Sequence, residues 1–148
     1  MRRSIFLTVL MMIMINVMPV KAEVIIGEQT QAIVTKALEL TGNYTKPITG
    51  GDEQSARMLY AEYGKIYEET YKYIKEPPKN TWQSEIECVK EVNSIVNMRR
   101  QVLLDYIIMV EAYKNNRAEE YKQMITILYE DTYMVNEMRE NFYERYGI

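Results

Sequence analysis

The sequence predicts an all-α fold, an antiparallel helical bundle with a long C-terminal helical hairpin and a smaller N-terminal helical appendage. Between Trp82 and Tyr146 apolar residues recur at spacings of three and four, which is the period of a helix and not of a strand. The polar run 114–117 interrupts this pattern, and its two asparagines tolerate the left-handed conformation that closes a helix. Two long helices folded back on each other are therefore expected.

The N-terminal part of the bundle begins with an amphipathic helix within residues 23–41. One side of this segment is apolar and carries Ile33, Val34, Ala37 and Leu38. Gly42-Asn43 ends the helix, because these residues adopt the left-handed C-terminal turn at low cost. The next stretch, residues 44–51, has turn residues and no sustained period, so it is predicted to be a loop.

A second helix is predicted from Asp52 to about Lys75. The Asp52 carboxylate is a good N-cap, since it can accept backbone N–H bonds of the first turn. Pro77-Pro78 ends the helix, because proline clashes with the preceding turn. Asn80 or Thr81 is expected to cap the long helix that follows, and the short connection makes the two helices antiparallel neighbours.

Residues 1–22 have the features of a secretory signal peptide. Arg2 and Arg3 precede a short apolar segment, and small Ala22 stands before a cut that leaves Glu23 as the new N-terminus. An uncleaved anchor is the alternative, but the segment is shorter than the roughly 18 to 20 residues of a membrane helix. Cleavage leaves one domain of 126 residues, 23–148, with 15 basic and 21 acidic side chains. This acidic balance argues against nucleic-acid binding.

The mature chain lacks the residue patterns that catalysis or cofactor binding would need. It has no histidine, the commonest general base and metal ligand, and its single cysteine, Cys88, excludes an intramolecular disulfide. Cys88 is interpreted as a small hydrophobe at the edge of the packed face, with an intermolecular disulfide as the alternative. We therefore predict no enzyme activity, no cofactor and no metal site.

A tyrosine-rich face on the second helix and the loop before it are the candidate partner-binding residues. Tyrosine provides rigid amphipathic area and is favoured at protein contacts. The alternative is that this face is the core side of an ordinary helix. The candidates are Tyr44, Lys46, Tyr60, Tyr63, Tyr67 and Tyr71.

Arg99 and Arg100 interrupt the apolar stripe of the long helix, where an unpaired cation would be costly. Counting back from a turn near residues 115 and 116 places them opposite 131–134. They are therefore predicted to form a structural ion pair with an acidic group among Glu130, Asp131 and Glu137. A site for an anionic ligand is the alternative.

The order of these elements, the Ala22/Glu23 processing site and the absence of catalytic groups resemble the minor pilins of bacterial type IV secretion systems. The chain is similar in size to the short, roughly 17 kDa antigen members of that family. The resemblance implies a three-helix bundle with a smaller helical appendage, export to the periplasm, and a place on the cell surface or the extracellular pilus. It also implies roles in pilus assembly, in host or recipient cell contact and thus in virulence, without assigning any functional residue.

The expected partners are protein: pilus or secretion-channel subunits, a host surface protein, or a second copy of the chain. Neither nucleic acid nor a stable membrane anchor is expected after the signal is cleaved. Two other classes fit the same pattern. One is a soluble periplasmic helical chaperone or adaptor, and the other is a coiled-coil spacer anchored through residues 5–20.

Overall fold

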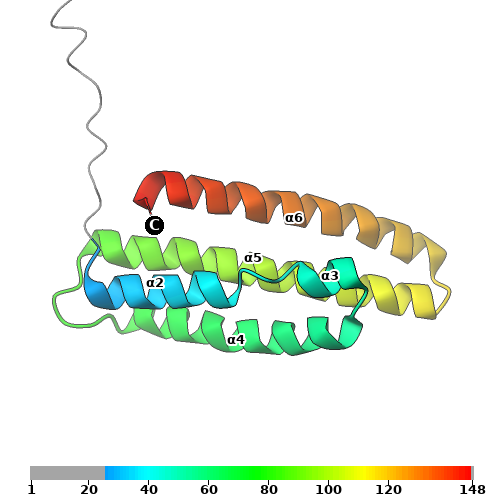
Figure 1. The fold of residues 1–148 in the computed structure, drawn as a ribbon, viewed down its shortest axis with the longest axis horizontal. Coiled ribbons are helices and arrows are strands. Elements are labelled where there is room, and N and C mark those ends of the chain that lie inside the picture. The colour runs from blue at the N-terminus through cyan, green and yellow to red at the C-terminus, as the bar shows by residue number, and fades with distance from the viewer. Residues whose placement is uncertain (1–25, 148) are drawn as a thin grey trace, which may run out of the picture.

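A computed structural model describes residues 26–147 as a bundle of helices, without strands in that range (Figure 1). The predicted all-α bundle with its long C-terminal hairpin is confirmed. The predicted signal peptide 1–22 and the new N-terminus Glu23 lie outside the described residues. The helices are α2 (Glu28–Leu40), α3 (Lys46–Gly50), α4 (Glu53–Lys75), α5 (Gln83–Lys114) and α6 (Ala118–Tyr146).

Two helix boundaries follow from the local signals in the sequence. The Asp52 carboxylate accepts the backbone N–H of Ser55 at 2.9 Å and caps α4, as predicted. Asn116 has a positive φ of 55° in the turn between α5 and α6. The predicted hairpin turn is therefore confirmed, and its left-handed residue is an asparagine, which adopts this conformation more readily than most residues.

Two local predictions are wrong. Residues 44–51 are not an open loop, because Lys46–Gly50 form the single helical turn α3, with Pro47 in its first turn and Gly51 closing it at a φ of 70°. The N-cap of α5 is Trp82 and neither Asn80 nor Thr81. The Glu85 carboxylate takes over the capping function, since it accepts the backbone N–H of Trp82 at 2.8 Å.

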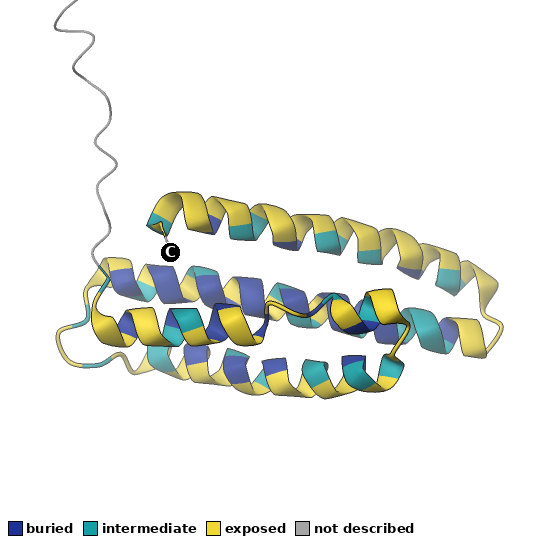
Figure 2. Ribbon diagram, in the orientation of Figure 1, coloured by how far each residue is buried: buried dark blue, intermediate teal, exposed yellow. Residues whose placement is uncertain are grey.

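α5 is the central helix, and α2, α4 and α6 all pack against it. Its buried residues run along most of its length, whereas α6 is largely exposed (Figure 2). α4 is antiparallel to α5 (Figure 1). Midway along their interface, Asn93 donates to Thr70 Oγ1 at 2.7 Å and to the carbonyl of Tyr67 at 3.0 Å. A hydrogen bond between two buried side chains, Asn93 and Thr70, thus joins α4 to α5.

The N-terminus of α2 is held by Glu85 of α5. Only 4% of Glu85 is exposed, and its Oε1 accepts the backbone N–H of Gly27 at 2.7 Å and the hydroxyl of Thr30 at 2.8 Å. The hydrogen bonds from Trp82, Thr30 and Gly27 lower the pKa of Glu85, so the group is a carboxylate at neutral pH. A negative charge here is favourable because the N-terminus of α2 is the positive end of its dipole.

The C-terminus of α2 is held by Arg99, which is 2% exposed. Its Nη1 donates to the carbonyl of Leu38 at 3.2 Å and to Thr41 Oγ1 at 2.6 Å. Burial lowers the pKa of Arg99, yet an arginine stays protonated in a protein. α2 therefore runs parallel to α5, with an acid at its positive end and a base at its negative end. We call this pair, Glu85 and Arg99, the α5 clamp.

The predicted ion pair between the two arginines and the acids of α6 is wrong. Arg99 points to α2, and Arg100 lies over the ring of Tyr60 of α4 at 4.3 Å from its centroid. Among the described residues, no salt bridge joins either arginine to Glu130, Asp131 or Glu137. The prediction failed because α2 and α4 also pack against α5. The end of α2 provides the carbonyl that Arg99 binds, and α4 provides the aromatic ring that Arg100 covers.

The extensive contacts of α6 are all with α5. Three of its inward residues, Leu128, Val135 and Phe142, belong to the common core at helical spacing. Asp131 lies in the same row and faces Asp105 of α5, which is only 3% exposed. Two carboxyl groups therefore meet in the one large interface that α6 makes within residues 26–147.

Burial and the facing Asp131 raise the pKa of Asp105 to about 6. Gln101 donates to Asp105 Oδ1 at 2.8 Å, while Oδ2 is buried without a partner. A proton shared with Asp131 would give Oδ2 a hydrogen bond, whereas two ionised carboxylates repel each other. The α5–α6 interface is therefore tighter when one of the two groups is protonated.

We predict that Arg99→Met lowers the free energy of unfolding by roughly 2 to 4 kcal/mol, because it leaves the buried acceptors of Leu38 and Thr41 without a donor. Urea unfolding followed by circular dichroism measures this loss. Arg57→Met is the matched control, since Arg57 is exposed and forms surface ion pairs with Glu53 and Glu111. Equal losses in the two variants would contradict the α5 clamp.

We predict that Asp105→Asn stabilises the protein at pH 7 and does so much less near pH 4. The folded pKa of Asp105, about 6, lies above its ordinary value of 3.8. Ionisation in the folded state therefore costs free energy, and this cost grows between about pH 4 and pH 6 and then stays constant. The gain at pH 7 should be about 1 to 3 kcal/mol. Denaturation at both pH values measures it, and a gain independent of pH would contradict the carboxyl pair.

Candidate functional site

Two of the predicted partner-binding tyrosines are core residues. Tyr44 is 4% exposed and Tyr63 is fully buried. The guanidinium of Arg99 lies 5.7 Å from the centroid of the Tyr44 ring. Burial raises the pKa of Tyr63 to about 12, and neither hydroxyl has a hydrogen-bond partner. Neither side chain can contact a partner in this fold, so the prediction is wrong for both.

The other members of the tyrosine-rich face are divided between core and surface. Tyr60 and Tyr67 are half-buried and pack against the core. Tyr71 is 41% exposed, stacks on Tyr67 with ring centroids 6.2 Å apart, and has the ammonium of Lys75 near its ring. This face is therefore mainly the core side of α4, which is the alternative that the sequence left open.

Lys46 is exposed on α3, as a partner-binding residue would be. It is not close to Tyr71, however. α3 precedes the first turn of α4, whereas Tyr71 lies in its last turns, about 27 Å away along the helix at 1.5 Å per residue. The structure therefore does not bring the predicted partner-binding residues together into one surface.

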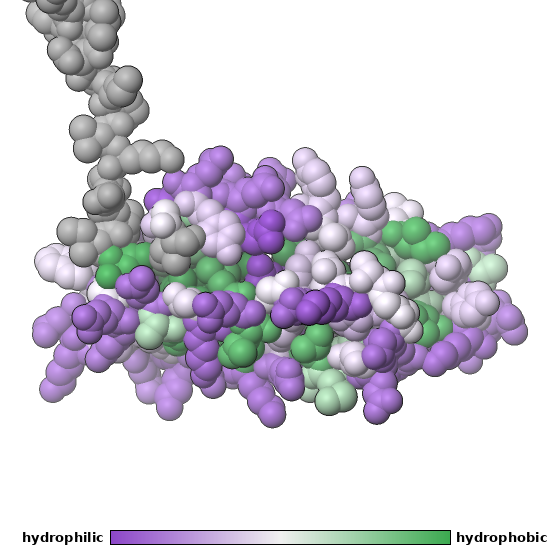
Figure 3. Space-filling view, in the orientation of Figure 1, coloured by the Kyte–Doolittle hydropathy of each residue, from purple (hydrophilic) through white to green (hydrophobic). Residues whose placement is uncertain are grey.

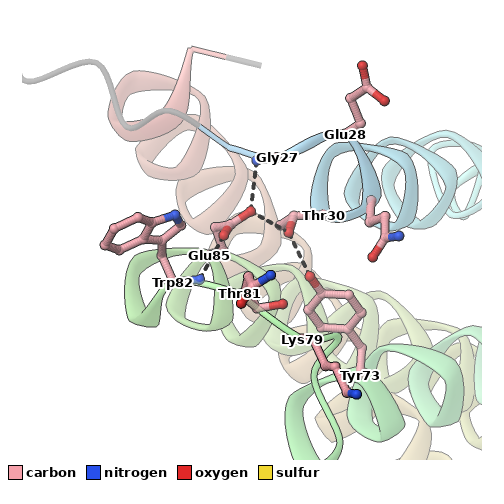
Figure 4. Close-up of a pocket in the computed structure, with 10 residues that line it drawn as sticks. Gly27, Glu28, Thr30, Tyr73, Lys79, Thr81, Trp82 and Glu85 are labelled. Carbon is pink, nitrogen blue, oxygen red and sulfur yellow. Dashed lines mark hydrogen bonds between the residues drawn. The ribbon is translucent and has the colours of Figure 1, made fainter.

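A cavity of about 410 Å³ opens at the end of the bundle where α2 and α5 begin. Figure 4 shows the Glu85 carboxylate at its base, with Thr30, Tyr73 and Trp82 around it. Both carboxylate oxygens already accept hydrogen bonds from Gly27, Thr30 and Trp82. Since the carboxylate is ionised and its acceptors are used by the protein, it is part of the α5 clamp and not a free acid or base.

The single cysteine of the chain is held in an unreactive state. Cys88 is fully buried, and burial raises the pKa of its thiol to about 12. This matches the small-hydrophobe interpretation, because an intermolecular disulfide needs an accessible thiolate. No group of side chains within residues 26–147 is arranged to hold a metal ion.

The outer side of α6 is the largest concentration of exposed apolar side chains that the sequence analysis missed. Six of the eleven large hydrophobic residues that are exposed in residues 26–147 belong to this helix. Three of them, Ile125, Tyr129 and Tyr133, are 44%, 75% and 67% exposed. They are spaced four apart and so form one row, which we call the α6 ladder.

The α6 ladder faces solvent because the opposite side of the helix packs on α5. In Figure 3 pale side chains of intermediate hydropathy stand out along the middle of α6, and strongly hydrophilic ones cover its C-terminal half. The spacing of 125, 129 and 133 was visible in the sequence. A row of this kind is as typical of a buried face as of an exposed one. The row is exposed here because no other helix of residues 26–147 covers this side of α6.

Acidic side chains border the α6 ladder. Glu130, Glu137 and Glu140 are exposed, and no salt bridge within residues 26–147 uses any of them. Glu137 follows Tyr133 by four residues and so continues the row of the ladder. The ladder and its border thus combine exposed aromatic rings with negative charge on one side of α6.

Within residues 26–147 no helix has the length and apolar character needed to cross a membrane. Comparison of the chain with protein-family models, with curated proteins and with solved structures found no match. The surface feature that the geometry of residues 26–147 defines most clearly is the α6 ladder with its acidic border.

Proposed function

We propose that the chain is a non-enzymatic minor subunit of a type IV secretion pilus, which acts in pilus assembly and in contact with host or recipient cells. The observation that carries this proposal is the α6 ladder, an aromatic row left open to solvent on a bundle whose other long helices pack on at least two neighbours. Exposed tyrosines of this kind are common anchors in protein interfaces.

Two further features support the proposal. The order of elements in the sequence resembles that of the minor pilins, with export features before a helical bundle. Glu85 shows one role of the acidic groups, since its carboxylate accepts hydrogen bonds within the fold, whereas Glu137 is exposed to solvent. A subunit that acts by contact needs a stable bundle with one open face, and residues 26–147 have this design.

The first test is deletion of the gene. Secretion or pilus assembly should be lost while the secretion ATPases remain present, and the protein should appear in material sheared from the cell surface. Recovery of the protein only from the periplasm, together with normal secretion in the deletion strain, would reject the pilus proposal and favour a periplasmic chaperone or adaptor.

The second test asks whether the α6 ladder is the contact surface. We predict that the double substitution Tyr129→Ala/Tyr133→Ala fails to restore secretion in the deletion strain, although its circular dichroism and unfolding midpoint stay close to those of the parent protein. Surface substitutions seldom destabilise a fold, whereas aromatic anchors dominate binding.

Met58→Ala is the matched control for this prediction. Met58 is 60% exposed on α4 and lies on a helix different from the ladder. It should restore secretion fully. If the ladder variant restores secretion as well as Met58→Ala does, then α6 is not the contact surface of the pilus subunit.

A further inference from the structure

α6 carries most of the net negative charge of residues 26–147. It holds seven carboxylates against three cations, a net charge of −4, whereas residues 26–117 hold 13 acidic and 12 basic side chains. The rest of the bundle is thus close to neutral. The charge excess coincides with the helix that exposes the most apolar side chains.

The acids beside the α6 ladder are not engaged by the protein itself. Arg99 binds α2 and Arg100 lies over Tyr60, so the cations that could have neutralised Glu130 and Glu137 are directed elsewhere. Both glutamates are exposed. A partner that supplies cations here would gain charge pairs at the rim without breaking an existing one.

We infer that the α6 ladder binds a basic polypeptide surface, one that offers an apolar groove for Tyr129 and Tyr133 between rows of lysine or arginine. The inference rests on the proposed function, because it specifies the chemistry of the partner at the same surface. Charge complementarity across an interface steers association and selects partners, while desolvated aromatic anchors supply most of the affinity.

The same charge excludes other occupants of this surface. A net charge of −4 on α6 repels phosphates, so neither nucleic acid nor an anionic lipid surface suits it. A second copy of α6 would bring like charges together. A zwitterionic membrane could accept the tyrosines, but it would gain nothing from the unpaired glutamates.

The direct test measures binding of the purified exported protein to a synthetic helical peptide in which two rows of lysine flank a leucine stripe. A second peptide has glutamate in place of every lysine. The lysine peptide should bind and the glutamate peptide should not. Affinity for the lysine peptide should fall about tenfold between roughly 50 mM and 300 mM salt, because exposed charge pairs are screened over this range.

Two variants locate the binding on α6. Tyr129→Ala/Tyr133→Ala and Glu130→Gln/Glu137→Gln should each weaken binding of the lysine peptide by about tenfold. The control is Glu62→Gln/Glu68→Gln, which removes two exposed acids from α4 and should change the affinity less than about twofold. Circular dichroism verifies that each variant keeps its helical fold.

Three results would overturn the inference. The first is equal weakening in the α4 control, which would indicate unspecific charge attraction. The second is equal binding of both peptides, and the third is binding of phosphatidylcholine vesicles in preference to the lysine peptide.

The deletion strain separates this inference from the proposed function. Normal secretion without the gene rejects the pilus role even if the peptide binds α6. Lost secretion with no α6-dependent peptide binding rejects only the basic partner.

Discussion

The rest of the structure depends on the α5 clamp, in which Glu85 and Arg99 hold the two ends of α2. The two residues are fourteen positions apart, about 21 Å along α5, and α2 has 13 residues, or about 20 Å. The signs match the dipole of α2. A shift of α2 by one turn would bury both charges without partners, which costs far more than a shift between apolar surfaces. The clamp therefore sets the register of α2 on α5.

This register determines which surfaces stay open. With Arg99 directed to α2 and Arg100 to Tyr60 of α4, neither arginine of α5 pairs with Glu130, Asp131 or Glu137. Only Asp131 of those acids turns inward, while Glu130 and Glu137 remain exposed beside the α6 ladder. The packing of α2 and α4 on α5 thus determines the partners of the two arginines, and these partners are not the acids of α6. The negative outer face of α6 reflects the excess of carboxylates in its own sequence, which the two arginines of α5 do not pair.

α6 is docked on the bundle mainly through a single neighbour, α5. Its large interface is with α5 alone, and that interface contains the Asp105–Asp131 carboxyl pair, in which burial opposes ionisation. The ion pair near its C-terminal end, between the exposed Arg145 and the half-buried Glu91, lies at the surface and contributes little. Apolar residues such as Val135 and Phe142 therefore supply most of the attraction. Among the long helices of residues 26–147, the one that carries the candidate contact surface is also the one that packs on the fewest neighbours.

The sequence by itself determined the helices and most of their ends. Apolar spacing, the Asp52 cap and the asparagines of the hairpin turn act within a few residues, so they could be read without a fold. It did not determine the partner of Arg99 or whether Tyr63 and Tyr129 are buried or exposed. The row of tyrosines that includes Tyr63 is partly buried, whereas the row that includes Tyr129 is exposed. The two rows differ because another helix covers only the first. Only the tertiary structure decided that α2 covers one side of α5 and that the outer side of α6 stays open, since these contacts join residues far apart in the chain.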